Sequence, residues 1–266
     1  MRNRFLFVAL FLLLASSVAS AQTLTTAKEY FDRAYKRAVA GDQAGAIADY
    51  TKVIELVPGD YSAYSNRALA KKKSGDKTGA MADYNSSISI KPDYSYALRG
   101  RGLLRKDLGD TTGAMADFNK LLAANPKDGL TYFDRGSLRN TLKDYPGAVS
   151  DFTNAILYNP TEKESYYNRA LALKASGKIN EAIADYDKYI SLNTDNTRYL
   201  ADGYQNRGVA KTIIKDYAGA VADLTVAIKL FPEDAVLYTN RADAYRKMGK
   251  IALATADETK AASLKK

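Results

Sequence analysis

The chain has 266 residues, a formal net charge of +9, and no cysteine, histidine or tryptophan. Without cysteine there are no disulfides or thiolate metal sites, and without histidine the chain lacks the commonest metal ligand and the only side chain that titrates near neutrality unaided. We therefore expect no catalytic residue, no metal and no cofactor, and the positive charge favours anionic partners.

The first element in chain order has the layout of a secretory signal peptide. Residues 1–4 are short and basic, residues 5–15 are apolar, and Ala19-Ser20-Ala21 supplies the small residues of a cleavage site before Gln22. A membrane-spanning helix needs about 20 apolar residues, so cleavage is favoured over an uncleaved anchor. We predict that residues 1–21 are a signal peptide, that the mature chain is secreted or periplasmic, and that it has no membrane span after cleavage.

From residue 27 onward the chain repeats. Successive arginines are separated by steps of 34, 34, 34, 34, 38 and 34 residues, and an aspartate column keeps step with them. The arginines are Arg33, Arg67, Arg101, Arg135, Arg169, Arg207 and Arg241, and the aspartates are Asp49, Asp83, Asp117, Asp151, Asp185, Asp223 and Asp257. A fixed period of this size predicts a solenoid, in which each unit buries its apolar face against its neighbours.

Each unit predicts two helices. A small residue follows each arginine, as in Ala34, and a second small residue follows 12 positions later, as in Ala46, so two helices can pack closely. Between them, Gly41 suits the end of one helix and Asp42 the start of the next. The predicted repeats, together forming a solenoid over residues 22–266, are 27–60, 61–94, 95–128, 129–162, 163–196, 201–234 and 235–266.

This pattern of Tyr-x-Asn-Arg-Ala/Gly, then Ala-x-x-Asp-Tyr/Phe, then proline, resembles the tetratricopeptide repeat family. The resemblance implies an all-α fold, a right-handed superhelical solenoid of antiparallel helix pairs. It also implies a non-enzymatic scaffold whose first helices line a concave groove for a protein or peptide partner. The arginine departs from the family pattern, which more often has an apolar residue there.

The arginine and aspartate columns have two interpretations. They could be a catalytic or ligand-binding row, or a structural ladder of ion pairs between helices. Each arginine precedes a close-packed Ala or Gly, and most of the aspartates precede an aromatic residue expected to be buried. A planar guanidinium suits a confined carboxylate, so we favour a structural ladder in which each arginine bonds an aspartate in its own or an adjacent repeat.

By the same resemblance, the residues flanking these columns would point into the groove. They are Phe31, Tyr35, Ser65, Leu69, Lys72, Arg99, Leu103, Lys106, Phe133, Ser137, Asn140, Tyr167, Leu171 and Lys174, followed by Gln205, Val209, Thr212, Thr239, Asp243 and Arg246. Four cations in this set, Lys72, Lys106, Lys174 and Arg246, form a basic row that would attract acidic side chains or a terminal carboxylate. The alternative is that they are only a solvated face.

Two features interrupt the register. Four extra residues fall within 193–200. This insertion favours a lengthened linker or an extra helical turn over the alternative, a calcium-binding loop. Glu258 replaces the aromatic or leucine of the other repeats, as in the polar cap of a terminal repeat.

These observations together predict a protein or peptide partner of acidic character and no nucleic acid. The alternative function is binding of an envelope or cell-wall polymer through the basic groove.

Overall fold

The computed structural model describes residues 26–193 and 197–265. The predicted signal peptide, residues 1–21, and residues 194–196 of the predicted linker lie outside the described residues.

The described residues form fourteen α-helices and no strand. They are α1 (Ala27–Val39), α2 (Gln43–Leu56), α3 (Tyr61–Lys73), α4 (Lys77–Ile90), α5 (Ser95–Asp107), α6 (Thr111–Ala124), α7 (Gly129–Thr141), α8 (Tyr145–Tyr158), α9 (Lys163–Ala175), α10 (Ile179–Leu192), α11 (Arg198–Ile213), α12 (Tyr217–Leu230), α13 (Ala235–Lys247) and α14 (Ile251–Ser263). The prediction of an all-α superhelical solenoid of helix pairs is confirmed.

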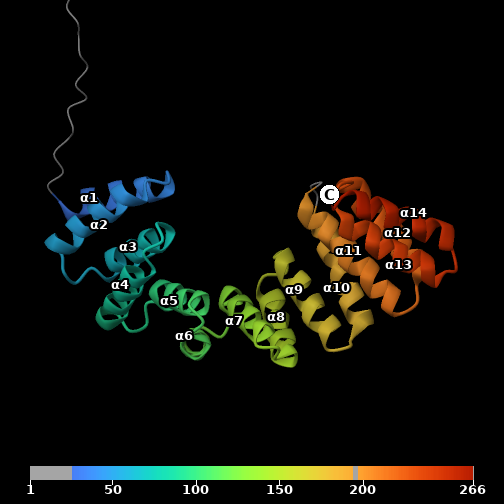
Figure 1. Cartoon of the computed structure of the whole chain (residues 1–266). Coiled ribbons are helices and arrows are strands. Elements are labelled where there is room, and N and C mark those ends of the chain that lie inside the picture. The colour runs from blue at the N-terminus through green and yellow to red at the C-terminus, as the bar shows by residue number, and fades with distance from the viewer. Residues whose placement is uncertain (1–25, 194–196, 266) are drawn as a thin grey trace, which may run out of the picture.

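Consecutive helices pack as antiparallel pairs, and the pairs follow one another along a curved path with α1 and α14 at opposite ends (Figure 1). Each second helix also packs against the first helix of the next pair. The first helices of neighbouring repeats touch directly, as α3 and α5 do, whereas no comparable contact joins two second helices in the described part of the chain. The first helices therefore lie on the inner side of the curve.

Small residues let the two helices of a pair approach. Ala34 and Ala46 are fully buried between α1 and α2. In the third repeat, a Cβ atom on Gly102 would lie 2.8 Å from the Phe118 ring, so only glycine fits at that packing distance. This close packing brings the arginine of each first helix within reach of the second helix.

The turn within each pair also follows from local sequence. Gly41 ends α1 with φ +89°, and Asp42 caps α2 by accepting a hydrogen bond from the backbone N–H of Gly45. In the fourth and sixth repeats a lysine takes the place of the glycine, and Lys143 and Lys215 keep the positive φ of 61° and 68°. The turn geometry is therefore conserved between repeats even where glycine is absent.

Candidate functional site

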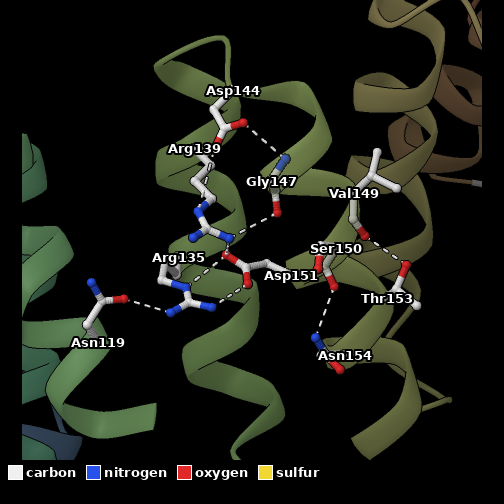
Figure 2. Close-up of polar contacts among 10 residues, drawn as sticks. All are labelled: Asn119, Arg135, Arg139, Asp144, Gly147, Val149, Ser150, Asp151, Thr153 and Asn154. Carbon is white, nitrogen blue, oxygen red and sulfur yellow. Dashed lines mark hydrogen bonds and ion pairs between the residues drawn. The ribbon is translucent and has the colours of Figure 1, made fainter. Parts of the chain in front are cut away.

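Every arginine of the column forms a two-pronged ion pair with the aspartate 16 residues later, in its own repeat. In the fourth repeat, Arg135 Nε donates to Asp151 Oδ2 at 2.9 Å and Arg135 Nη2 donates to Asp151 Oδ1 at 2.7 Å (Figure 2). The same two bonds recur in the other six repeats. The aspartates are only 1 to 6% exposed, so each pair joins the first and second helices across a buried contact.

The third guanidinium nitrogen reaches the preceding repeat. Arg135 Nη1 donates to Asn119 Oδ1 at 2.6 Å, and Arg67 Nη1 donates to Thr51 Oγ1 at 3.0 Å. Equivalent bonds start from the other arginines after the first repeat. Six arginines thus use all three nitrogens inside the chain, which fixes the register between adjacent pairs and points to a structural role for the column.

A second cation, four residues after the arginine, shares the aspartate in five repeats. In the fourth repeat Arg139 Nη1 donates to Asp151 Oδ2 at 2.9 Å (Figure 2). The second cations are Arg37, Lys71, Arg105, Arg139 and Lys211. Leu173 and Tyr245 occupy this position in the fifth and seventh repeats, so Asp185 and Asp257 have a single cationic partner in the described part of the chain.

The electrostatics of the ladder favour the charged forms. The hydrogen bond to its aspartate raises the pKa of Arg67, Arg169 and Arg241 above the ordinary value, against the opposing effect of burial. The tyrosine three residues earlier covers the guanidinium in most repeats; the Tyr64 ring centre, for example, lies 5.6 Å from Arg67 Cζ. These arginines therefore stay cationic and enclosed.

The inner surface of the first three repeats contains a hollow of about 510 Å³. Six residues expected in the groove line it: Phe31, Tyr35, Ser65, Leu69, Arg99 and Leu103. Five further residues line it as well: Asn66, Tyr84, Tyr94, Tyr96 and Gly100. Tyr84 reaches the hollow because Gly100 has no side chain, and a Cβ atom there would lie 2.5 Å from the Tyr84 ring.

Two more hollows adjoin the first. One, of about 410 Å³, lies between α5, α6 and α7 and is lined by apolar residues, Leu98, Leu121 and Leu130 among them, and by charged residues that include Asp93, Lys120 and Asp128. The other, of about 180 Å³, extends to the start of α9. Arg99 lines all three hollows, Tyr96 lines the two larger ones, and Leu130 lines the two smaller ones. The three hollows therefore adjoin one another in repeats one to five and share Arg99 as a common wall.

Sequence reasoning missed Tyr96 and Leu130. Each lies three residues before a predicted groove position, Arg99 or Phe133, and residues three apart share one face of a helix. That spacing was the available signal.

The four cations of the basic row all have partners within the chain. Lys72 Nζ lies 2.8 Å from Asp107 Oδ2, Lys106 Nζ lies 3.4 Å from Ser137 Oγ, and Lys174 Nζ lies 2.9 Å from Asn206 Oδ1. These bonds connect first helices of adjacent repeats.

The fourth cation of the row, Arg246, pairs with Glu258, which connects α13 to α14. Glu258 is exposed.

In the fifth and sixth repeats the groove side chains bond one another. Asn206 Nδ2 donates to the Tyr167 hydroxyl at 3.1 Å while Asn206 Oδ1 accepts from Lys174. Leu171 packs against the core around Tyr186, and Thr212 is buried and donates to the Gly208 carbonyl oxygen.

The other predicted groove residues are dispersed. Phe133 lies in the smallest hollow with its ring against Phe152, whereas Asn140 lines none of the three hollows. The later positions Gln205, Val209, Thr239 and Asp243 line none of these hollows either.

The described chain consists of residues 26–193 and 197–265. Neither range contains a group of three or more His, Cys, Asp or Glu side chains placed to hold a metal ion. None of the helices described there has the length and apolar character needed to cross a membrane.

Comparison with known proteins gives one family. The tetratricopeptide repeat model matches residues 61–94 and 163–196, which have the same bounds as the second and fifth predicted repeats. No curated protein sequence matches the chain with significance.

Solved structures share the fold. A tetratricopeptide repeat protein from Parabacteroides merdae superposes with a TM-score of 0.65 at 24% identity, covering 90% of this chain and 93% of that one. YrrB, described as a TPR protein with an unusual peptide-binding site, gives a TM-score of 0.61 at 22% identity, covering 71% and 94%. PilW, described as a widely conserved type IV pilus biogenesis factor, gives 0.68 at 18% identity, covering 77% and 94%.

Proposed function

We propose that this chain is a tetratricopeptide repeat protein, a non-enzymatic scaffold outside the cytoplasm that binds a protein or peptide in its concave groove. The observation that carries the proposal is the set of three adjoining hollows in repeats one to five, the first of which lies between the first helices of repeats one to three. Concave sites lined by apolar and aromatic side chains with a few placed polar groups are the usual form of a binding site. The peptide-binding site of YrrB, a protein of the same fold, supports the same interpretation.

The scaffold role, in place of catalysis, is supported by how the buried charges are used. The aspartates of the column are bonded to arginines through both oxygens, so they hold helices together and are not presented to a substrate. We assign no catalytic residue on this basis.

The location outside the cytoplasm depends on residues 1–21. The test is amino-terminal sequencing of the native protein after cell fractionation. We expect a chain that begins at Gln22 in the secreted or periplasmic fraction. A chain that begins at Met1 and fractionates with the cytoplasm would contradict this part of the proposal.

The binding role is tested by one substitution inside the groove and one outside it. Leu69 lines the largest of the three hollows and is 44% exposed, whereas Leu157, 67% exposed on α8, lines none of the three. After affinity purification from native extract, we expect Leu69→Glu to lose the co-purified partner and Leu157→Glu to keep it. Equal recovery with both variants would refute binding in this groove.

The same purification tests the alternative, recognition of an envelope polymer. All four cations of the basic row already bond within the chain, which weakens their claim as a polymer-binding surface. A polymer that co-elutes with the wild type and is lost with Leu69→Glu would favour the alternative over a protein partner.

A further inference from the structure

Arg99 is the one charged side chain among those lining the 510 Å³ hollow, and it also lines the two adjoining hollows. It lies on α5 where the three hollows meet. Any segment that lies along the groove through the third repeat would pass this guanidinium.

The bonding of Arg99 differs from that of the arginine ladder. Arg99 Nε donates to Asp134 Oδ2 at 2.6 Å, and Asp134 is 6% exposed on the neighbouring helix α7. Within residues 26–193 and 197–265, the two terminal nitrogens of Arg99 have no hydrogen-bond partner, whereas all three nitrogens of Arg135 are bonded. Asp134 thus holds the guanidinium in place while its terminal edge stays available, and the Arg99 side chain is 37% exposed.

The free edge of a guanidinium fits a carboxylate, because its two parallel N–H groups match two carboxylate oxygens. Both sides of Arg99 offer apolar surface. Leu69 and Leu103 line the hollow on one side, and Leu121 and Leu130 line the hollow on the other. The ligand should therefore carry apolar groups on both sides of its carboxylate.

In an extended peptide every second side chain points to the same face. An acidic residue that contacts Arg99 would therefore direct the side chains two positions before and two positions after it toward the two hollows. A carboxylate at the end of a chain would leave one hollow empty. The geometry favours an internal Asp or Glu over a terminal carboxylate.

We propose that Arg99, held by Asp134, anchors an extended partner segment in which an internal Asp or Glu is flanked at two-residue spacing by large apolar residues. This inference rests on the proposed function, since it names the partner chemistry of the same groove. The charge for the acidic partner predicted from the sequence comes from Arg99 and not from the row of Lys72, Lys106, Lys174 and Arg246.

The test uses the solenoid, residues 22–266, and three synthetic peptides titrated by calorimetry. The first is acetyl-Leu-Thr-Glu-Thr-Leu-amide, the second has Gln in place of Glu, and the third is acetyl-Leu-Thr-Leu with a free terminal carboxylate. We expect the Glu peptide to bind at least about tenfold more tightly than either of the others, because a charge-assisted, two-pronged hydrogen bond is among the strongest polar contacts.

Two variants assign that preference to Arg99. Arg99→Gln combined with Asp134→Asn removes both charges, so no carboxylate is left buried without a partner, and it should bind the Glu and Gln peptides equally. Asp134→Asn alone keeps Arg99 and should keep the preference; asparagine is tolerated at this position, because Asn66, Asn168, Asn206 and Asn240 occupy it in other repeats. Thermal melting confirms that each variant is folded.

Three results would overturn the anchor: equal binding of the Glu and Gln peptides to the wild type, a preference that survives in the double variant, or no binding of any peptide. These failures are distinguishable from failure of the proposed function. If Leu69→Glu still abolishes partner recovery, the groove binds a partner by other contacts. If Leu69→Glu has no effect on recovery, the groove itself is not the binding site.

Discussion

Repeats one to four and repeats five to seven share one ladder but differ in their inner surface. The arginine and aspartate pairs have the same geometry at both ends, as in Arg67 with Asp83 and Arg241 with Asp257. Two hollows, of about 510 and 410 Å³, lie in repeats one to four, whereas the hollow of about 520 Å³ in repeats six and seven lies at the start of α11, the turn between α12 and α13 and the end of α14. In repeats five and six, Asn206, Tyr167 and Lys174 bond one another across the corresponding surface.

The difference shows that the repeated positions build the scaffold and the variable positions decide whether its inner face is open. Gly100 leaves room for the Tyr84 ring in the third repeat, whereas Asn206, at the equivalent position, extends two bonds to neighbouring side chains. Polar groups that bond one another are no longer available to a partner. We call repeats one to four, residues 27–162, the open half. This half is therefore the one expected to bind a partner.

The largest expected effect is the loss of stability when a ladder arginine is removed, and it should differ between the two regions. Arg135 and Arg169 are similarly enclosed, at 16 and 20% side-chain exposure, but Asp151 keeps Arg139 when Arg135 is removed, and Asp185 has no second cation. We expect Arg169→Leu to cost about 3 kcal/mol in the free energy of unfolding, because it leaves a buried carboxylate unpaired, and Arg135→Leu to cost less. Urea unfolding measures both.

The matched controls remove the carboxylate as well. Arg169→Leu with Asp185→Leu should recover part of the loss, and so should Arg135→Leu with Asp151→Leu by a smaller amount. If each single variant is no less stable than its double variant, the ladder does not consist of buried ion pairs.

The next effect concerns the polar network that covers the inner face of repeats five and six. Asn206→Ala removes bonds to Tyr167 and Lys174 and should cost about 1 to 2 kcal/mol in unfolding free energy. Asn168→Ala is the control. The Asn168 side chain donates to the Glu164 carbonyl oxygen four residues earlier, and the Asn206 side chain makes the equivalent bond to the Asp202 carbonyl oxygen. Equal losses in thermal or urea unfolding would mean that the network adds nothing beyond this local bond.

A smaller effect is expected at the junction between repeats five and six. There Arg207 Nη1 donates to Asp187 Oδ1 at 2.6 Å. At the preceding junction, between repeats four and five, the equivalent bond runs from Arg169 Nη1 to the uncharged Thr153 Oγ1 at 3.1 Å. Asp187 is 55% exposed, so Asp187→Ala should cost no more than about 1 kcal/mol, and Thr153→Ala less still. Unfolding midpoints in low salt and high salt separate the two, because only the charged bond should weaken with salt.

The smallest effect is a pH dependence in the open half. Burial raises the pKa of Asp134 above its ordinary value of 3.8, while the charge of Arg99 opposes the shift. Because the folded pKa lies above the unfolded one, the stability contributed by this proton is present below pH 3.8 and lost as the pH rises through the folded pKa. The melting temperature of the wild type relative to Asp134→Asn should therefore rise as the pH falls from 7 to 3.5; a constant difference would contradict it.

The sequence was sufficient for the fold because the period repeats the same packing residues in phase. It left open whether an arginine pairs within its repeat or across repeats, since that depends on how Arg135 Nη1 and Nη2 point once α6 and α8 are packed around α7. From the sequence we also expected Lys72 and Lys174 to be unpaired cations. In the structure their long side chains instead bond Asp107 and Asn206 on the first helix of the next repeat.

Of the predicted groove positions in the first three repeats, all but Lys72 and Lys106 line one hollow, as Phe31, Leu69 and Leu103 do. Those further along do not, because Leu171 is drawn into the core around Tyr186 and Tyr167 bonds Asn206. The position in the repeat determines which face of the helix carries a side chain. The neighbouring residues determine what that side chain contacts.

The central claim, that the partner binds the open half, is tested most directly by the same substitution in both halves. Leu103 and Leu171 occupy one column, and Ser137 shows that serine is accommodated there. Leu103→Ser should raise the dissociation constant for the co-purified partner about tenfold, because apolar contact is lost. Leu171→Ser should leave the dissociation constant unchanged. An unchanged dissociation constant for Leu103→Ser, or a loss confined to Leu171→Ser, would contradict the account.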